Sequence, residues 1–106
     1  MFRSTIVAED NLNWLIDWYA RHCDGDWEHG YGVKIDTLDN PGWQLKIDLT
    51  GTKLENVVFE RIEHNLDNDI SWWTCVIRDK AFQAYCGARD LASVISVFRS
   101  WAERNQ

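Results

Sequence analysis

Helical spacing of apolar residues occurs near both ends of this chain, and the sequence between those two stretches alternates in the manner of strands. The first stretch covers residues 9–23 and the second covers residues 91–104. Because the predicted helices are segregated from the predicted strands, the sequence indicates the α+β fold class. We expect the order α-β-β-β-β-β-α, with an N-terminal and a C-terminal helix packed on one face of an antiparallel sheet of about five strands.

The first helix is predicted to bury one apolar stripe along its length. The residues that recur at helical spacing are Leu12, Leu15, Ile16, Tyr19 and Cys23. Trp14 and Trp18 lie four residues apart on the flank of this stripe. There they either widen the buried face or remain available to a partner.

The second helix has the clearest apolar pattern in the chain. Its residues at helical spacing are Leu91, Val94, Ile95, Phe98, Trp101 and Ala102. Asp90 precedes them and is the predicted N-cap, while Arg104 suits the negative end of the helix dipole.

A β-hairpin is predicted in the first part of the region between the helices. Residues 33–37 and 43–49 alternate apolar and polar positions, as half-buried antiparallel strands do. The sequence LDNPG between them combines Asx residues, proline and glycine, which favour a turn. If the apolar residues face the helices, the opposite, wetter face carries Lys34, Asp36, Gln44, Lys46 and Asp48.

Three further strands are predicted at residues 57–64, 70–78 and 81–86, with turns at residues 65–69 and at Asp79 and Lys80. Together with the hairpin they form a meander. Within the fourth strand Trp73, Cys75 and Ile77 should point to one face of the sheet, and Trp72, Thr74 and Val76 to the other.

Length and charge restrict the partners. The chain has 106 residues, of which 45% are hydrophobic, which fits one domain over residues 1–106. Residues 24–69 hold eleven acidic and four basic residues, so their net charge of −7 exceeds the −6 of the whole chain. This charge disfavours nucleic acid and anionic membrane, both polyanions, and suits a basic protein partner.

The sequence predicts a cytoplasmic protein. The first residues, MFRSTIVAEDNL, lack the pattern of a signal or transit peptide. No apolar run approaches the ~18 residues of a membrane span. Cys23, Cys75 and Cys86 form an odd set without a CxxC pair, so we expect free thiols.

Residues 22–29, HCDGDWEH, are rich in potential metal ligands, but their spacing does not fit a metal site. Counted from Asp24, the glycine of an EF-hand loop falls one place late and position twelve is Ile35 instead of Glu. Zinc would need a second Cys or His cluster, and downstream only Cys75, Cys86 and His64 are scattered. We therefore expect no metal and no cofactor.

Two other functions remain open as alternatives. A small metal-dependent hydrolase could use carboxylate pairs such as Asp24 with Asp26, or Asp39 with Glu28, and Cys23 could form a couple with a neighbouring His22 or His29. No hydrolase or nucleotide-binding motif accompanies these residues. A small-ligand-binding module with an aromatic pocket near the same segment is the other alternative.

Residues 18–55, WYARHCDGDWEHGYGVKIDTLDNPGWQLKIDLTGTKLE, closely resemble the immunity protein 53 family of bacterial polymorphic toxin systems. The ordered motifs WY, CDGDWEH, TLDNPGW and IDL-x-x-T carry the resemblance. It implies a protein that is not an enzyme and that protects its producer by occupying the toxic domain of a cognate secreted toxin. Many such toxins are nucleases with basic grooves, which an acidic partner would complement. The oligomeric state stays open.

We select the residues expected to contact the toxin by their chemistry alone, because the family resemblance assigns no contact residues. Acids that surround large aromatics near one sheet edge resemble an anchor-plus-charge interface. The candidates are Asp24, Asp26, Trp27, Glu28, His29, Asp36, Asp39, Asn40, Trp43 and Asp48. We expect Trp27, Pro41, Gly42 and Trp43 to build the fold, so the better candidates for contact are Asp24, Asp26, Glu28 and Asp39.

Overall fold

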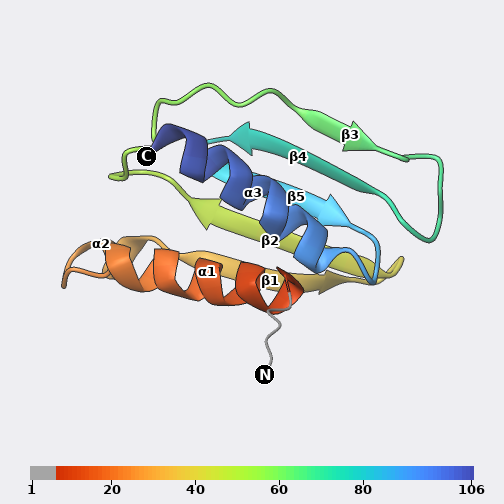
Figure 1. The fold of residues 1–106 in the computed structure, drawn as a ribbon, viewed down its shortest axis with the longest axis horizontal. Helices are drawn as coiled ribbons and strands as arrows, with labels where there is room; N and C mark the ends of the chain where they lie inside the picture. The colour runs from red at the N-terminus through yellow and green to blue at the C-terminus, as the bar shows by residue number, and fades with distance from the viewer. Residues whose placement is uncertain (1–6) are drawn as a thin grey trace.

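Two long helices lie on one face of a five-stranded antiparallel sheet in the computed structural model, which describes residues 7–106 and their side chains from residue 10 (Figure 1). The predicted α+β architecture is therefore confirmed. The elements are α1 (Val7–His22), α2 (Trp27–Gly30), β1 (Val33–Leu38), β2 (Gly42–Asp48), β3 (Ile62–His64), β4 (Trp73–Arg78), β5 (Ala81–Cys86) and α3 (Leu91–Asn105). Within the described residues, neither long helix is long and apolar enough to cross a membrane.

The strand order is β1-β2-β5-β4-β3, so the predicted meander is wrong. The hairpins β1–β2 and β4–β5 form as expected, but β2 pairs with β5 and not with β3. Gly42 allows this pairing, because a Cβ on it would lie 2.2 Å from the carbonyl oxygen of Cys86. The second hairpin closes through Asp79 and Lys80, whose φ angles of 56° and 58° suit a two-residue turn.

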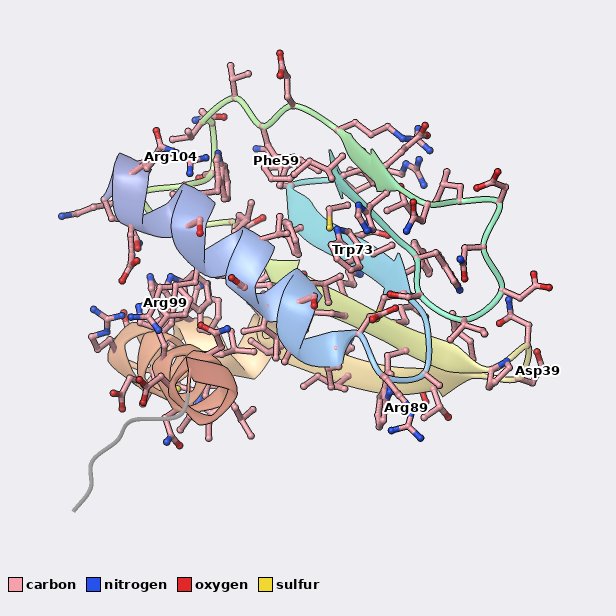
Figure 2. All side chains as sticks on the ribbon, turned by 45° about the vertical axis from the view of Figure 1, so that its right-hand side comes forward. Asp39, Phe59, Trp73, Arg89, Arg99 and Arg104 are labelled. Carbon is pink, nitrogen blue, oxygen red and sulfur yellow. The ribbon has the colours of Figure 1, made fainter. Side chains whose placement is uncertain are left out.

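The strand predicted at residues 57–64 is shorter, since only Ile62–His64 pairs with β4. The residues before β3 pack against α3 instead of pairing with β4. The Phe59 ring packs edge-on against Phe82 and Trp101, with ring centroids 5.5 and 5.3 Å apart, and Trp101 Nε1 donates to the Val58 carbonyl oxygen at 3.0 Å. Figure 2 shows Phe59 on the segment that passes beside α3.

The strand predicted at residues 70–78 begins at Trp73, because Asp90 holds the residues before it. The Asp90 carboxylate is buried and accepts from Ser71 Oγ at 3.1 Å and from the Trp72 amide at 3.0 Å. Asp90 stands at the N-cap position of α3, as predicted, but its side chain makes no cap hydrogen bond. The carboxylate joins the start of α3 to the start of β4 instead.

The core between the helices and the sheet is centred on Phe98, and α3 buries the face that its pattern predicts. The Phe98 ring contacts Trp18, Phe82 and Trp101, with centroids 5.3, 5.1 and 6.0 Å apart. From the sheet, Cys75 is buried while Trp73 and Ile77 pack against this core, so the predicted orientation of these three residues is correct.

The predicted buried face of α1 is wrong. Leu15 and Trp18 are buried, but Leu12, Ile16 and Tyr19 are 46%, 54% and 38% exposed. The helix is rolled so that its two tryptophans face α3, where Trp14 and Trp18 both pack edge-on against Phe98. An indole buries more apolar area than a leucine or isoleucine side chain, so burial of the Trp side is the more favourable choice.

A polar contact supports the same orientation of α1. Asn11 is buried, and its Oδ1 accepts from Arg99 of α3 at 3.3 Å. The Arg99 guanidinium also lies 5.8 Å from the centre of the Trp14 ring and pairs with Glu103 at 3.3 Å. Figure 2 shows Arg99 between the two helices.

Two neighbouring alanine substitutions test this orientation. Leu15→Ala should lower the free energy of unfolding by about 2–5 kcal/mol, because it leaves a cavity in the core. Ile16→Ala should change it by about 0.5 kcal/mol or less, because that side chain is mostly in solvent. Urea denaturation of both variants measures the difference, and equal losses would mean that Ile16 faces the core.

Candidate functional site

The ten predicted contact residues do not meet at one point: eight lie in or beside the edge strand β1, and Trp43 and Asp48 lie in its neighbour β2. Six of them belong to the segment before β1 or to β1 itself, and Asp39 and Asn40 form the turn after it. Six residues of strand, about 20 Å, separate the two ends of β1. Figure 2 shows Asp39 at the tip of the hairpin. Glu28 and Asp39 therefore cannot act as one catalytic pair.

The loop between α1 and β1 is held by two carboxylates that satisfy backbone N–H groups. Asp24 Oδ1 accepts from the amides of Asp26 and Trp27, both at 3.0 Å. Glu28 reaches back, and its two oxygens accept from the amides of Asp24 and Gly25 at 2.9 and 2.8 Å. These reciprocal bonds close the loop just before the short helix α2, which the sequence did not predict and whose N-cap residue, Asp26, makes no side-chain cap hydrogen bond.

These hydrogen bonds favour the charged forms of both acids. The amides of Trp27 and then Asp26 lower the pKa of Asp24 below its usual value. The pKa of Glu28 is lowered by its own backbone amide first, and then by those of Asp24 and Gly25. Gly25 has a φ of +92°, a conformation that glycine adopts without strain. Asp24 and Glu28 are thus structural residues of the loop.

Trp27 anchors the same loop to the core, as predicted. Its ring lies edge-on to Trp18 at 6.1 Å, and its Nε1 donates to the Thr50 carbonyl oxygen at 2.8 Å. Tyr19 and Tyr31 flank the ring at 6.1 and 6.2 Å. The side chain is 8% exposed, so it offers little area to a partner.

Three further candidates are also tied to the fold. Trp43 Nε1 donates to the Ala88 carbonyl oxygen at 2.9 Å, and Asp48 Oδ2 accepts from the Gly32 amide at 3.0 Å. Asp36 Oδ1 accepts from the amide of Thr37, its neighbour on β1, at 2.8 Å.

The remaining candidates project from the surface. Asp26, His29, Asp39 and Asn40 are exposed, and no side-chain hydrogen bond or ion pair holds them within the part of the chain that the structure describes. They are the predicted residues best placed to meet a partner.

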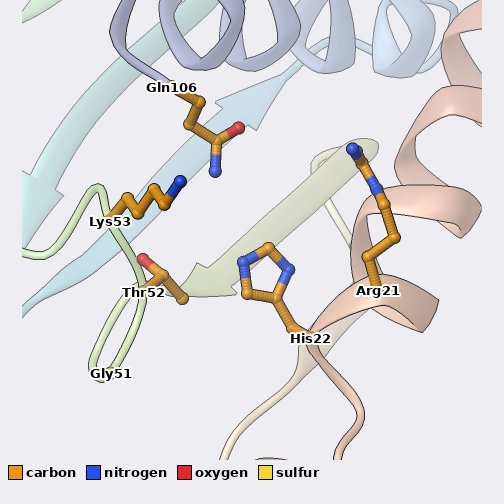
Figure 3. A pocket seen from close by; sticks show the side chains of 6 residues that line it. All are labelled: Arg21, His22, Gly51, Thr52, Lys53 and Gln106. Atoms are coloured by element: carbon orange, nitrogen blue, oxygen red, sulfur yellow. The ribbon is translucent and has the colours of Figure 1, made fainter.

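Several hollows border the loop. One, of about 500 Å³, is lined by Asp24, Asp26, Trp27, His29, Gly30, Tyr31 and Gly51. A second, of about 320 Å³, lies where the loop meets the start of β1 and is lined by Tyr19, Glu28, His29, Gly30, Tyr31, Gly32, Val33, Lys34 and Asp48. A third, of about 420 Å³, lies at the end of α1 (Figure 3). There Arg21 and His22 face Lys53 and Gln106, so cationic and amide groups surround the space.

The geometry does not assemble a nucleophile or a metal site from the described residues. Cys23 Sγ donates to the Tyr19 carbonyl oxygen at 3.4 Å, and His22 Nδ1 donates to that of Trp18 at 2.6 Å. Both side chains therefore bind carbonyl groups in the last turn of α1 and do not form a thiol–imidazole couple. In residues 10–106 no three His, Cys, Asp or Glu side chains gather as a metal site would require.

Sequence reasoning missed the apolar residues that α1 leaves in solvent, because it placed Leu12, Ile16 and Tyr19 in the core. The signal was present in a second set of residues at helical spacing, Asn11, Trp14, Leu15, Trp18 and His22. The sequence of α1 thus contains two overlapping sets of residues at helical spacing. The packing of α1 against α3 determines which set is buried.

In a comparison with known families, the model of the family described as immunity protein 53 matches residues 12–103. No curated protein and no solved structure matches the chain.

A matched pair of substitutions tests the roles of the two neighbouring acids. Asp24→Ala should speed hydrogen exchange at the amides of Asp26 and Trp27 by about tenfold, because both lose their acceptor. Asp26→Ala should leave the exchange rates of Trp27 and Gly25 nearly unchanged. Exchange followed by NMR at neutral pH measures both, and similar rates in the two variants would contradict the proposed role of Asp24.

The pH dependence of the loop follows from the lowered pKa values. The contribution of Asp24 and Glu28 to stability is fully present above their ordinary values of 3.8 and 4.5 and is lost as pH falls through the lower folded-state values. In an NMR titration, the amide signals of Gly25 and Trp27 should shift with midpoints below 4.5 and 3.8 respectively. Asp24→Asn should abolish the Trp27 transition. Midpoints at the ordinary values would show that the hydrogen bonds do not form in solution.

Proposed function

The chain belongs to the immunity protein 53 family, and we propose that it binds and neutralises a cognate toxin domain of a bacterial polymorphic toxin system. The observation that supports this proposal most strongly is the extent of the family match, from Leu12 in α1 to Glu103 in α3. The match includes every strand of the sheet and most of both long helices, so the whole folded unit is related, beyond a single motif.

The protein acts by occupancy and not by catalysis. The acids that could have formed a catalytic pair are committed elsewhere: Asp24 and Glu28 bind backbone amides, and Asp39 lies at the far end of β1. A stable complex that covers the active groove of the toxin is sufficient for protection. We place this complex in the cytoplasm of the producing cell, with the chain acting as one domain.

The charge distribution supports a basic toxin, such as a nuclease. Residues 10–40, which form most of α1 and all of α2 and β1, hold seven acidic and two basic residues. A toxin that binds a polyanion carries the opposite charge in its groove. Attraction between the two surfaces would speed their encounter and fix their relative orientation.

Co-expression tests the proposal directly. Cells that produce the toxin domain encoded by the neighbouring open reading frame should survive when this chain is made as well, and the two proteins should copurify in a fixed ratio. Cell death in the presence of folded chain, with no complex on a sizing column, would refute the proposal.

Charge reversal tests the electrostatic part. Asp26→Lys combined with Asp39→Lys should lower the association rate with that toxin domain about tenfold at low salt and change the dissociation rate little. The control is Glu60→Lys combined with Glu63→Lys, which adds the same charge at β3 on the opposite edge of the sheet. Stopped-flow kinetics at two salt concentrations measures both. Equal reductions in the two variants would place the interface away from the β1 edge.

A further inference from the structure

Strand β1 is an edge strand with an open outer side. It is first in the strand order, and among the strands of residues 7–106 it pairs with β2 alone. Its four central residues, 34–37, are exposed, so neither face of the strand is well covered. An edge of this kind presents unpaired N–H and C=O groups to which another strand can bind.

The register of the hairpin identifies which backbone groups point outward. The Asp48 amide donates to the Gly32 carbonyl oxygen at 3.0 Å, so the Gly32–Asp48 pair is hydrogen bonded. Because hydrogen-bonded and non-bonded pairs alternate in antiparallel strands, the backbone groups of Val33, Ile35 and Thr37 face away from β2. Asp36 accepts from the Thr37 amide, whereas no described residue bonds the amide of Val33 or Ile35.

The exposed apolar residues of α1 adjoin this edge. Ile35 is 41% exposed and faces the helix side of the sheet, since its partner Leu45 is buried there. In Figure 1, α1 lies over β1. A Cβ on Gly32, just before β1, would lie 3.7 Å from the Tyr19 ring, so the helix and the strand meet at this end. We define the β1 edge surface as Leu12, Ile16, Tyr19, Val33 and Ile35.

We propose that the β1 edge surface binds an extended segment of the toxin domain as a sixth strand of the sheet. Backbone hydrogen bonds to Val33 and Ile35 would hold the segment. Its side chains alternate between two faces, so every second one would lie against Leu12, Ile16 and Tyr19. The site therefore fits a segment with apolar residues at alternate positions. This inference rests on the proposed function and names the surface that performs it.

Charge selects a basic toxin over a second copy of this chain. The elements that carry the surface, residues 10–40, contribute a net charge of −5, with Glu28 close to Tyr19 and with Lys34 and Asp36 on either side of Ile35. Two copies paired through β1 would bring two elements of the same net negative charge together, which costs free energy. A basic domain gains from the same charges.

The opposite edge of the sheet is a poorer site. Strand β3 has three residues, and its flank carries an ion pair between Arg61 and Glu63 at 3.2 Å. A strand this short offers few outward backbone groups, which disfavours pairing at an edge. None of the three helices lies along β3 to offer apolar side chains to an added strand (Figure 1).

Two substitutions at Ile35 separate the backbone from the side chain. Ile35→Pro removes the outward N–H together with the isoleucine side chain but no hydrogen bond to β2, since those bonds involve the neighbouring residues. Ile35→Thr replaces the same side chain and keeps the N–H. Affinity for the toxin domain of the neighbouring open reading frame should fall about tenfold further in Ile35→Pro than in Ile35→Thr. Far-UV circular dichroism confirms that both variants fold.

The helix part of the surface is tested with a matched charge. Ile16→Glu should weaken binding about 30-fold. Val58→Glu adds the same charge to a side chain that is 85% exposed, on the segment beside the far end of α3, and should bind like the unmodified chain. Hydrogen exchange of the unmodified complex should protect the amides of Val33 and Ile35.

The outcomes distinguish the surface from the function. If the unmodified chain does not bind the toxin domain, both the proposed function and this inference fail. If it binds, but Ile16→Glu binds equally well and the amides of Val33 and Ile35 stay unprotected, only the inference fails, and the toxin occupies another surface. Loss in Ile16→Glu together with protection of both amides supports it.

Discussion

The edge-on contact between Trp18 and Phe98, with ring centroids 5.3 Å apart, is the interaction on which the surface of this protein depends. It sets the rotation of α1 about its own axis, because a tryptophan that is fully buried against α3 leaves the helix one orientation. The contact between Asn11 and Arg99 fits the same orientation from the other end of α1. Leu12, Ile16 and Tyr19 reach solvent as a direct consequence, beside the edge of the sheet.

The same tryptophan positions the acidic loop. Trp27 packs edge-on against Trp18 and binds the Thr50 carbonyl oxygen, so the loop before β1 is attached to both the helix and the end of β2. Asp24 and Glu28 then close the loop on itself through backbone amides. The hydrogen bonds hold the carboxylates of these two acids, whereas the exposed side chains of Asp26 and His29 make no hydrogen bond to the described residues.

A loop held by its own hydrogen bonds and an open strand would suit the proposed binding of a toxin domain. Little side-chain or backbone freedom is lost on association when the contact residues are already held in place. The acidic charge of residues 10–40 acts at longer range and would raise the rate of encounter with the proposed basic partner. Backbone hydrogen bonds at β1 and apolar contacts at α1 would act only after docking, and they would govern how long the complex lasts.

The sequence by itself determined the fold class, the two helices, the β1–β2 hairpin and the family, because these follow from local periodicity, turn residues and ordered motifs. The face of α3 was predictable, since Val94, Ile95, Phe98 and Trp101 form its one apolar stripe. Tertiary structure decided the rest. The tertiary structure pairs β2 with β5 and shortens β3, because Phe59 packs against Trp101 of α3. It also places the Asp90 carboxylate against the Trp72 amide before β4, where it does not cap α3. It also chose between two overlapping stripes on α1, because the area buried by Trp18 depends on a partner, Phe98, that lies 80 residues away in the chain.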